Sequence, residues 1–293
     1  MKIGDGYHPW SATWELTMGC NMRCKHCGSS CRDRLEGELT TDEALRLCDS
    51  IAENGIKYIT LTGGEPTTRK DWWIIASKLN SYGIQVNMVS NAWLINDDIA
   101  HKAKDAGVYN IALSLDGLQK THDYMRREGA FDHVMQAIDV LKEYGLNASV
   151  ITTINKQNIG ELKQLKEILI NKRVDAWQIQ YALPMGEFHK RKKELMIIPE
   201  QINDIIDFAY QNKDEIRIFL GDCIGYYTKK EMAVKENMFE YGRCWRGCPA
   251  GKYAVGILQN GDIVGCVSIR DKAFVEGNIK EQSLKDIWEN GFR

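Results

Sequence analysis

The sequence lacks the features of a membrane or secreted protein. No run of about eighteen apolar residues occurs anywhere in it, so we expect no transmembrane helix. The first six residues, Met1 to Gly6, contain no basic segment followed by an apolar one, which argues against a secretory signal. We therefore expect a cytosolic protein with no membrane partner.

Net charge is also nearly absent. The 38 Lys and Arg residues are balanced by 40 Asp and Glu residues, which gives a formal net charge of -2. This balance provides no general reason to expect nucleic acid as a partner. The local exception is the basic run from His189 to Lys193. We interpret it as a solvated helix face or loop, and the alternative is a patch for an acidic peptide or a phosphate.

Cysteine, in contrast, is plentiful, and nine cysteines in a cytosolic chain favour metal ligation or catalysis over disulfides. Cys20, Cys24 and Cys27 are spaced C-x3-C-x2-C, and Cys31 follows after three more residues. Three thiolates on one short loop suit a four-iron cube, whereas zinc usually takes two pairs of ligands set far apart. Three cysteines leave one iron open, and an open coordination position is typical of a metal site that does chemistry.

Apolar strands and amphipathic helices alternate along the first two thirds of the chain. Strands are predicted over 12–18, 58–62, 84–89, 110–115, 147–153 and 175–183, and helices over 41–52, 71–81, 97–105, 131–144 and 158–169. This alternation specifies a parallel sheet with right-handed crossovers. Periodicity alone fits a partial barrel and a flat, doubly wound sheet equally well.

The cysteine run, together with Gly63-Gly64-Glu65-Pro66 after the second strand, resembles the signature of the radical SAM superfamily. The resemblance implies an α/β fold with a partial, TIM-like (β/α)6 barrel over residues 12–215, after a lead-in at 1–11. It also implies that Cys20, Cys24 and Cys27 bind a [4Fe-4S] cluster whose open iron chelates S-adenosylmethionine. An electron from an external flavodoxin-type or ferredoxin-type donor would cleave this cofactor into methionine and a 5′-deoxyadenosyl radical, which abstracts a hydrogen atom from the substrate.

The resemblance also implies a set of residues that bind the cofactor. Gly63, Gly64 and Glu65 would bind its methionine end, and the backbone of His26 would contact the adenine. The polar residues at the ends of later strands would contact the rest of it: Asn91, Ser114, Asp116 and, as weaker candidates, Thr152 and Thr153. The alternative for each polar residue is ordinary strand-end solvation or helix capping.

Cys31 and Cys48 lie outside this ligand set. We interpret Cys48 as a packed structural thiol, because it falls on the buried stripe of the helix predicted over 41–52. Cys31 follows the cluster cysteines directly. A thiol there could donate a hydrogen atom to a radical, and the alternative is a second packed thiol.

A second cysteine group follows the barrel, at Cys223, Cys244, Cys248 and Cys266. Asn260-Gly261 lies between two apolar runs and predicts a hairpin with a type I′ turn, which would bring Cys248 and Cys266 together. The pattern Cys248, Gly261, Cys266 matches C-x(9-15)-G-x4-C of the SPASM and twitch extensions. The resemblance implies that residues 216–293 form a small hairpin-plus-helix domain with one auxiliary [4Fe-4S] cluster, held by all four of these cysteines or with one iron open.

Four cysteines suffice for one auxiliary cluster, which favours a twitch domain over a full SPASM domain. Only 27 residues follow Cys266, which would fit a truncated sequence. The alternative for this cysteine group is a structural zinc site.

Four functions remain open at this point. SPASM and twitch enzymes mostly modify ribosomally made peptides, forming thioether, carbon–carbon or related crosslinks, or oxidising side chains. About ten residues precede the first strand, so a peptide would be recognised by the barrel, by the basic run or by a separate peptide-binding partner. The second function is a dehydrogenase or cofactor-biosynthesis enzyme acting on a small molecule. An iron–sulfur electron carrier and a zinc-stabilised binding module are the non-enzymatic alternatives, and a carrier would leave Gly63-Gly64-Glu65-Pro66 unexplained.

Overall fold

The computed structural model describes residues 2–3, 6–221, 224, 228–236 and 248–292. Its main sheet has ten strands in the order β12-β11-β10-β3-β4-β5-β6-β7-β8-β9. The six strands from β3 to β8 are parallel neighbours that follow the order of the chain. Their bounds are Ser11–Thr17 (β3), Tyr58–Gly63 (β4), Gln85–Ser90 (β5), Val108–Ser114 (β6), Asn147–Ile154 (β7) and Ala176–Tyr181 (β8).

A helix connects each of these strands to the next. These helices are α1 (Thr41–Glu53), α2 (Trp72–Ser81), α3 (Asp97–Asp105), α5 (Ala130–Glu143) and α6 (Leu162–Asn171). A short helix that was not predicted, α4 (Gln119–Met125), is inserted between β6 and α5. The predicted alternation of strands and helices is confirmed.

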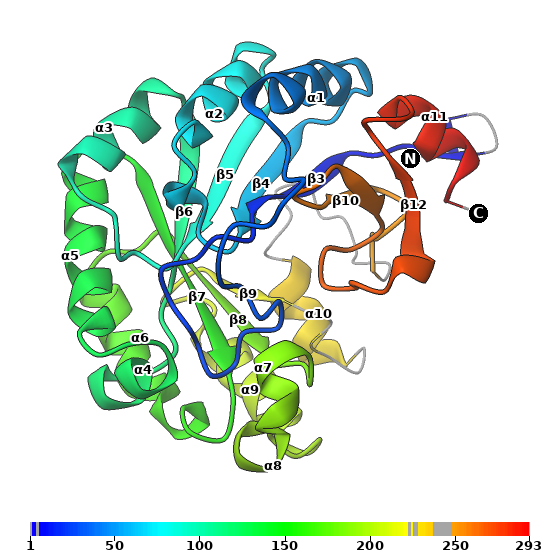
Figure 1. Cartoon of the computed structure of the whole chain (residues 1–293). Coiled ribbons are helices and arrows are strands. Elements are labelled where there is room, and N and C mark those ends of the chain that lie inside the picture. The colour runs from blue at the N-terminus through cyan, green and yellow to red at the C-terminus, as the bar shows by residue number, and fades with distance from the viewer. Residues whose placement is uncertain (1, 4–5, 222–223, 225–227, 237–247, 293) are drawn as a thin grey trace.

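The sheet is a partial barrel and not a doubly wound sheet. In β5 and β7 every second residue is buried, and the apolar ones among them belong to the core that also contains the helices. The residues between them are half-exposed and therefore line the opposite, inner face. Figure 1 shows the helices from α1 to α6 in an arc around the outside of the strands. The edge strands β9 (Ile218–Leu220) and β12 (Val275–Asn278) lie at opposite ends of the strand order.

The C-terminal hairpin extends the barrel sheet. β10 (Ala254–Ile257) pairs in parallel with β3, β11 (Asp262–Val264) pairs with β10, and β12 pairs with β11. The final helix, α11 (Leu284–Asn290), is capped by Ser283 as predicted. At the other edge β9, whose segment was assigned to the auxiliary domain, pairs with β8. The two predicted domains therefore share one sheet.

The turn of this hairpin differs from the predicted type I′ turn. A type I′ turn needs positive φ at both central residues, but only Gly261, at +93°, has it. The Gly261 N–H donates to Leu258 O (3.0 Å), and the Leu258 N–H donates to Asp262 O (2.9 Å). The loop is therefore longer than a two-residue turn, and the glycine occupies its left-handed position.

A small satellite core supports the loop that carries the first cysteines. It contains Met125, Ala182, Phe188 and Leu195. The last two come from α7 (Gly186–Lys190) and α8 (Lys192–Leu195), which follow β8. The basic run 189–193 lies on these two helices and is exposed, as a solvated helix face would be.

The remaining elements are short or follow the barrel strands. They are β1 (Lys2–Ile3), β2 (Gly6–Tyr7), α9 (Gln201–Asn212) and α10 (Lys229–Glu236), with short 3-10 turns at Pro66–Thr68, Ile159–Glu161 and Lys272–Phe274. Of these, α9 and α10 contribute buried residues such as Ile206 and Val234 to the main core. In the part of the chain that the structure describes, no helix has the length and apolar character needed to cross a bilayer.

The start of α1 offers a test of local helix chemistry. Thr40 Oγ1 accepts the Glu43 N–H (3.3 Å), and Glu43 Oε2 accepts the Thr40 N–H (2.8 Å), which forms a capping box. We expect Thr40→Ala to lower the free energy of unfolding by about 1 kcal/mol, measured by urea titration. The exposed Glu53 serves as the control, because Glu53→Ala removes no cap. Equal midpoints for the two variants would contradict this role of the cap.

Candidate active site

The first three cysteines lie on a loop that leaves the C-terminal end of β3. The Cys20 N–H donates to Arg32 O (2.7 Å), which closes the base of the loop, and the Cys27 N–H donates to Cys24 O (3.2 Å). All three thiols are partly buried. Chemistry in barrels of this kind occurs at the C-terminal ends of the strands, and the loop lies at that end.

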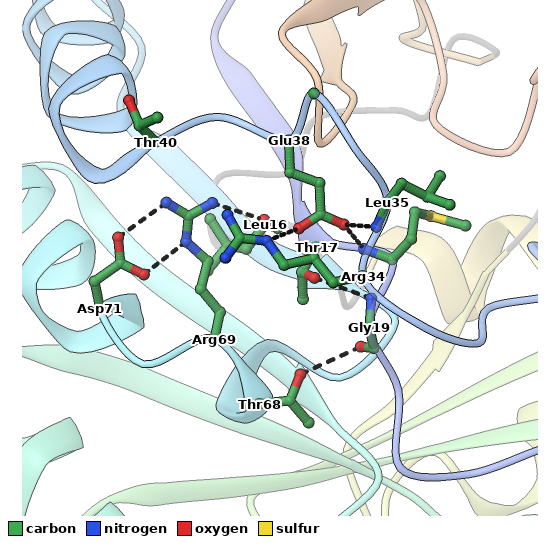
Figure 2. Close-up of polar contacts among 12 residues, drawn as sticks. Leu16, Thr17, Gly19, Arg34, Leu35, Glu38, Thr40, Thr68, Arg69 and Asp71 are labelled. Carbon is green, nitrogen blue, oxygen red and sulfur yellow. Dashed lines mark hydrogen bonds and ion pairs between the residues drawn. The ribbon is translucent and has the colours of Figure 1, made fainter.

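Two sets of polar contacts, made by Glu38 and by Arg69, hold the end of β3 from which this loop departs (Figure 2). The buried carboxylate of Glu38 accepts the N–H groups of Met18 (2.8 Å) and Leu35 (3.1 Å). On the other side the Arg69 guanidinium pairs with Asp71 (2.7 Å) and donates to Leu16 O (3.0 Å). The sequence did not predict the contacts of Glu38 or those of Arg69. Both sets restrain the end of β3.

Gly63 and Gly64 are required by the approach of two backbone segments. The Gly64 N–H donates to Thr17 O (2.6 Å), and the Glu65 N–H donates to Gly19 O (2.9 Å). A Cβ on Gly63 would lie 2.3 Å from Thr17 O, and one on Gly64 would lie 2.2 Å from Gly19 O. The glycine pair therefore packs directly against the start of the cysteine loop.

Glu65 is fully buried and connects the end of β4 to that of β5. Its Oε1 accepts the Thr67 (2.6 Å) and Ser90 (2.9 Å) hydroxyls, and its Oε2 accepts the Asn91 N–H (2.7 Å). Burial raises the pKa of this carboxyl. The Asn91 side chain in turn donates to Asn21 Oδ1 (2.7 Å), beside Cys20. The structure thus brings Glu65 and Asn91, both predicted site residues, to the cysteine loop.

Asp116 and His26 meet beneath the same loop. His26 Nε2 lies 3.0 Å from Asp116 Oδ2, and Arg126 Nε donates to the same oxygen (2.5 Å). Asp116 Oδ1 accepts the Thr153 N–H (2.8 Å). Burial alone would raise the pKa of Asp116, but Arg126 and His26 outweigh it and hold that pKa well below its usual range. Both Asp116 oxygens are therefore hydrogen-bonded within the protein.

Ser114 and Thr152 lie on opposite faces of the sheet. Ser114 is at an inner-face position of β6, because Ile111 and Leu113 face the core. Thr152 is fully buried on the helix-facing side, where its hydroxyl donates to Leu115 O (2.7 Å) and accepts from Trp177 Nε1 (2.8 Å). Of the two threonines at the end of β7, only Thr153 is at an inner-face position.

Each of the three predicted ligand sulfurs receives a hydrogen bond. The Met22 N–H donates to Cys20 Sγ (3.4 Å), and Arg126 Nη1 donates to Cys24 Sγ (3.9 Å). A hydrogen bond from the Cys31 thiol lowers the pKa of Cys27 to about 5, whereas burial raises that of Cys24 to about 11. Donors directed at thiolate sulfurs are typical of iron–sulfur sites, so these residues fit a cluster held by Cys20, Cys24 and Cys27.

The other thiols of the barrel are buried. Cys31 Sγ lies 3.7 Å from Gly63 O and 4.0 Å from Met18 Sδ, and its role as a hydrogen-atom donor stays a prediction. Cys48 is buried in α1 and donates to Ile75 O (3.9 Å), which confirms that it is a packed thiol.

The structure describes part of the second cysteine group. Cys248 is exposed and Cys266 is half-buried, while Cys223 and Cys244 lie outside the described residues. A Cβ on Gly265 would lie 3.8 Å from the Ala250 Cβ, so the segments that carry Cys248 and Cys266 run side by side. Within the described ranges, no three His, Cys, Asp or Glu side chains form a group that could hold a single metal ion.

One contact between the two parts of the chain was also missed. Arg270 follows Cys266 and pairs with Glu15 on β3, and it also donates to Ser29 Oγ (2.6 Å) in the cysteine loop. Glu15 is 2% exposed, and its Oε2 has no hydrogen-bond partner. A single carboxylate in a strand of otherwise uncharged residues was the available signal. Nothing in the local sequence indicated Arg270 or Arg126.

Comparison with protein-family models gives two matches. Residues 14–169 match the radical SAM superfamily, and residues 248–292 match SPASM, an iron–sulfur cluster-binding domain.

Similar curated proteins carry out different reactions. The chain is 31% identical to an AdoMet-dependent heme synthase of Methanosarcina barkeri, and the match covers 96% of this chain and 82% of that protein. It is 26% identical to the mycofactocin maturase MftC of Mycolicibacterium smegmatis, over 96% of this chain and 70% of that one.

Solved structures show the same fold at low identity. Streptococcus suis SuiB bound to its precursor peptide SuiA gives a TM-score of 0.79 at 19% identity, over 96% of this chain and 65% of SuiB. The structure of anSMEcpe with bound AdoMet gives 0.75 at 15% identity, over 96% of this chain and 81% of that one. The predicted partial barrel is confirmed.

These matches also bear on the predicted cofactors. The radical SAM match implies a [4Fe-4S] cluster and S-adenosylmethionine, and the SPASM match implies auxiliary iron–sulfur binding, as predicted. The number of auxiliary clusters stays a prediction. With the cysteine loop at the C-terminal end of the barrel strands and a family match over residues 14–169, the chain belongs to the radical SAM superfamily of enzymes.

Proposed function

We propose that this radical SAM enzyme acts on a peptide. In this proposal Cys20, Cys24 and Cys27 hold the cluster, the Gly63-Gly64-Glu65 segment receives the methionine end of the cofactor, and an external flavodoxin-type or ferredoxin-type protein delivers the electron. When bound, the cofactors supply a 5′-deoxyadenosyl radical that abstracts a hydrogen atom, while the protein positions the substrate and excludes water.

The composition of the inner face carries this proposal. Most inner positions of the barrel strands hold hydroxyls and amides, with apolar residues at Val89, Ala112 and Ile151. The hydroxyls and amides are Ser11, Thr13, Thr60, Thr62, Gln85, Asn87, Asn110, Ser114, Asn147, Ser149, Thr153, Gln178 and Gln180. No Lys, Arg or His occurs in the described strands β3 to β9, and Glu15 is their single carboxylate.

A lining of this kind matches the needs of a peptide. Each peptide N–H and C=O that leaves water needs a hydrogen-bond partner, and neutral hydroxyls and amides both donate and accept. At the C-terminal end of the inner face, Gln180 Nε2 already donates to Thr153 Oγ1 (3.2 Å), and nearer the N-terminal end Asn110 Nδ2 donates to Ser149 Oγ (2.9 Å). Gln180 and Thr153 can exchange their mutual contact for contacts with a substrate backbone.

A tetrapyrrole substrate is the second candidate, because one relative at 31% identity is a heme synthase. A coproporphyrin is an apolar macrocycle with several carboxylates. Its site would need apolar walls and cations that pair with those carboxylates. The described strands carry no cation, and the two arginines at the cysteine loop, Arg126 and Arg270, are already paired with Asp116 and Glu15. This favours the peptide.

The experiment uses the cluster-reconstituted protein under anaerobic conditions with S-adenosylmethionine and dithionite. Formation of 5′-deoxyadenosine tests the superfamily chemistry. Two substrates are then compared: any short peptide encoded in a neighbouring reading frame, and Fe-coproporphyrin III. We expect a mass change in the peptide and no shift of the porphyrin absorption band. Decarboxylation of Fe-coproporphyrin III would overturn the peptide proposal and support the tetrapyrrole.

A further inference from the structure

A buried ion pair lies directly beside one of the proposed cluster ligands. The Arg126 side chain is 11% exposed, and its Asp116 partner is completely buried. The guanidinium donates to Asp116 through Nε (2.5 Å) and to Cys24 Sγ through Nη1 (3.9 Å). Arg126 is the cationic group that the described structure places in contact with a cluster cysteine sulfur.

The backbone keeps this guanidinium in place. Arg126 follows α4, and its N–H donates to His122 O (2.9 Å). The residue before it, Met125, accepts the Lys25 N–H (2.8 Å) from the cysteine loop, next to Cys24. This hydrogen bond joins the cysteine loop to the end of α4.

The positive charge of Arg126 lies nearer to the cysteine sulfur than the negative charge of Asp116. Asp116 Oδ1 accepts the Thr153 N–H, and its Oδ2 is shared by His26 Nε2 and Arg126 Nε. The Arg126 guanidinium therefore lies between the carboxylate and Cys24 Sγ. An arginine guanidinium stays protonated in proteins, so this group is a permanent cation. A charge in a low-dielectric interior acts more strongly than one in water.

We propose that Arg126 is a positioning residue that sets the reduction potential of the cluster by directing its charge and an N–H donor at Cys24. Reduction adds one electron from the external donor and makes the cluster and its thiolates more negative. Net charge and hydrogen bonds to the sulfurs are among the factors that set such potentials. A cation beside Cys24 stabilises the reduced state more than the oxidised state. The inference depends on Cys24 being a ligand, as in the proposed function.

The test is an EPR-monitored redox titration of the reconstituted full chain without S-adenosylmethionine. We expect Arg126→Gln, which removes the charge, to lower the ratio of reduced to oxidised cluster about tenfold at a given potential. This corresponds to a midpoint about 59 mV more negative for a one-electron couple. Arg126→Lys keeps the charge, and we expect its midpoint to stay close to that of the wild type.

A variant of Asp116 is predicted to shift the midpoint potential in the opposite direction. Asp116→Asn removes the negative charge that partly cancels the field of Arg126, so we expect the midpoint to become less negative. A purely structural role of the ion pair would not move the two variants in opposite directions. Iron and sulfide are counted first, so that only variants with wild-type cluster content are titrated.

The matched control is Lys166→Gln. Lys166 is also a buried cation paired with a carboxylate, but its hydrogen bonds go to Asn212 and Glu215, outside the site, and not to a cysteine. We expect its midpoint to be unchanged. An unchanged midpoint in Arg126→Gln, a shift in Arg126→Lys as large as in Arg126→Gln, or shifts of the same sign in Arg126→Gln and Asp116→Asn would overturn the inference. Absence of any cluster in the wild type would instead refute the proposed function.

Discussion

Replacement of Cys24 by serine is expected to abolish 5′-deoxyadenosine formation and to remove the iron and sulfide of one cluster. Cys24 is one of three thiols that the loop holds at the C-terminal end of the barrel, with its sulfur contacted by Arg126. A cube with three protein ligands loses a third of them in this variant. The measurement is iron and sulfide per chain after anaerobic reconstitution, with chromatography of the nucleoside product.

Cys48→Ala is the matched control for this prediction. Cys48 is another free thiol of the barrel, but it is fully buried in α1, and its Sγ donates to Ile75 O of α2. We expect this variant to keep the cluster and the activity, with a modest loss of stability from the small cavity. Full activity in Cys24→Ser would refute the ligand assignment. The iron that remains in that variant reports auxiliary clusters separately.

The strands and helices of the barrel were predictable because their signals are local. An alternation of period 2 places Ile59 and Leu61 on the helix-covered face, and a period of 3.6 places Leu47 and Ile51 of α1 in the same core. The same alternation could have shown that Thr152 faces the helices and Thr153 faces the inside of the barrel, because Val150 and Ile154 are buried on the helix side. The prediction that the sheet curves into a partial barrel depended on the family resemblance, because a partial barrel and a flat, doubly wound sheet have the same sequence periods.

The contacts that shape the candidate site were not predictable in the same way. Arg270 and Glu15 are 255 residues apart in the chain, and Arg126 and Cys24 are 102 apart. Periodicity reports which face of an element is apolar, but not which polar side chains from different elements meet. Asp116 shows the consequence: its position at a strand end was evident, whereas its pairing with Arg126 was not.

Gly64→Ala is expected to be among the most destabilising single substitutions in the barrel. The added Cβ would lie 2.2 Å from Gly19 O and 2.7 Å from Met18 O. Both are backbone atoms, so no side chain can rotate away, and β4 and the cysteine loop must separate. Overpacking costs about 1–3 kcal/mol in ordinary cores, and we expect a loss at the top of that range or beyond it. The measurements are the urea midpoint of the cluster-free protein and the iron retained after reconstitution.

Gly28→Ala separates this steric effect from a general sensitivity of the loop. Gly28 follows Cys27 directly, yet a Cβ there meets nothing within 4 Å, and its φ lies outside the left-handed region. Alanine at such a position usually stabilises by about 0.4–1 kcal/mol, because it reduces the freedom of the unfolded chain. We therefore expect Gly28→Ala to keep the cluster with an equal or higher midpoint. If Gly64→Ala did the same, the close packing of the glycine pair on the loop would not be what holds the cysteines in place.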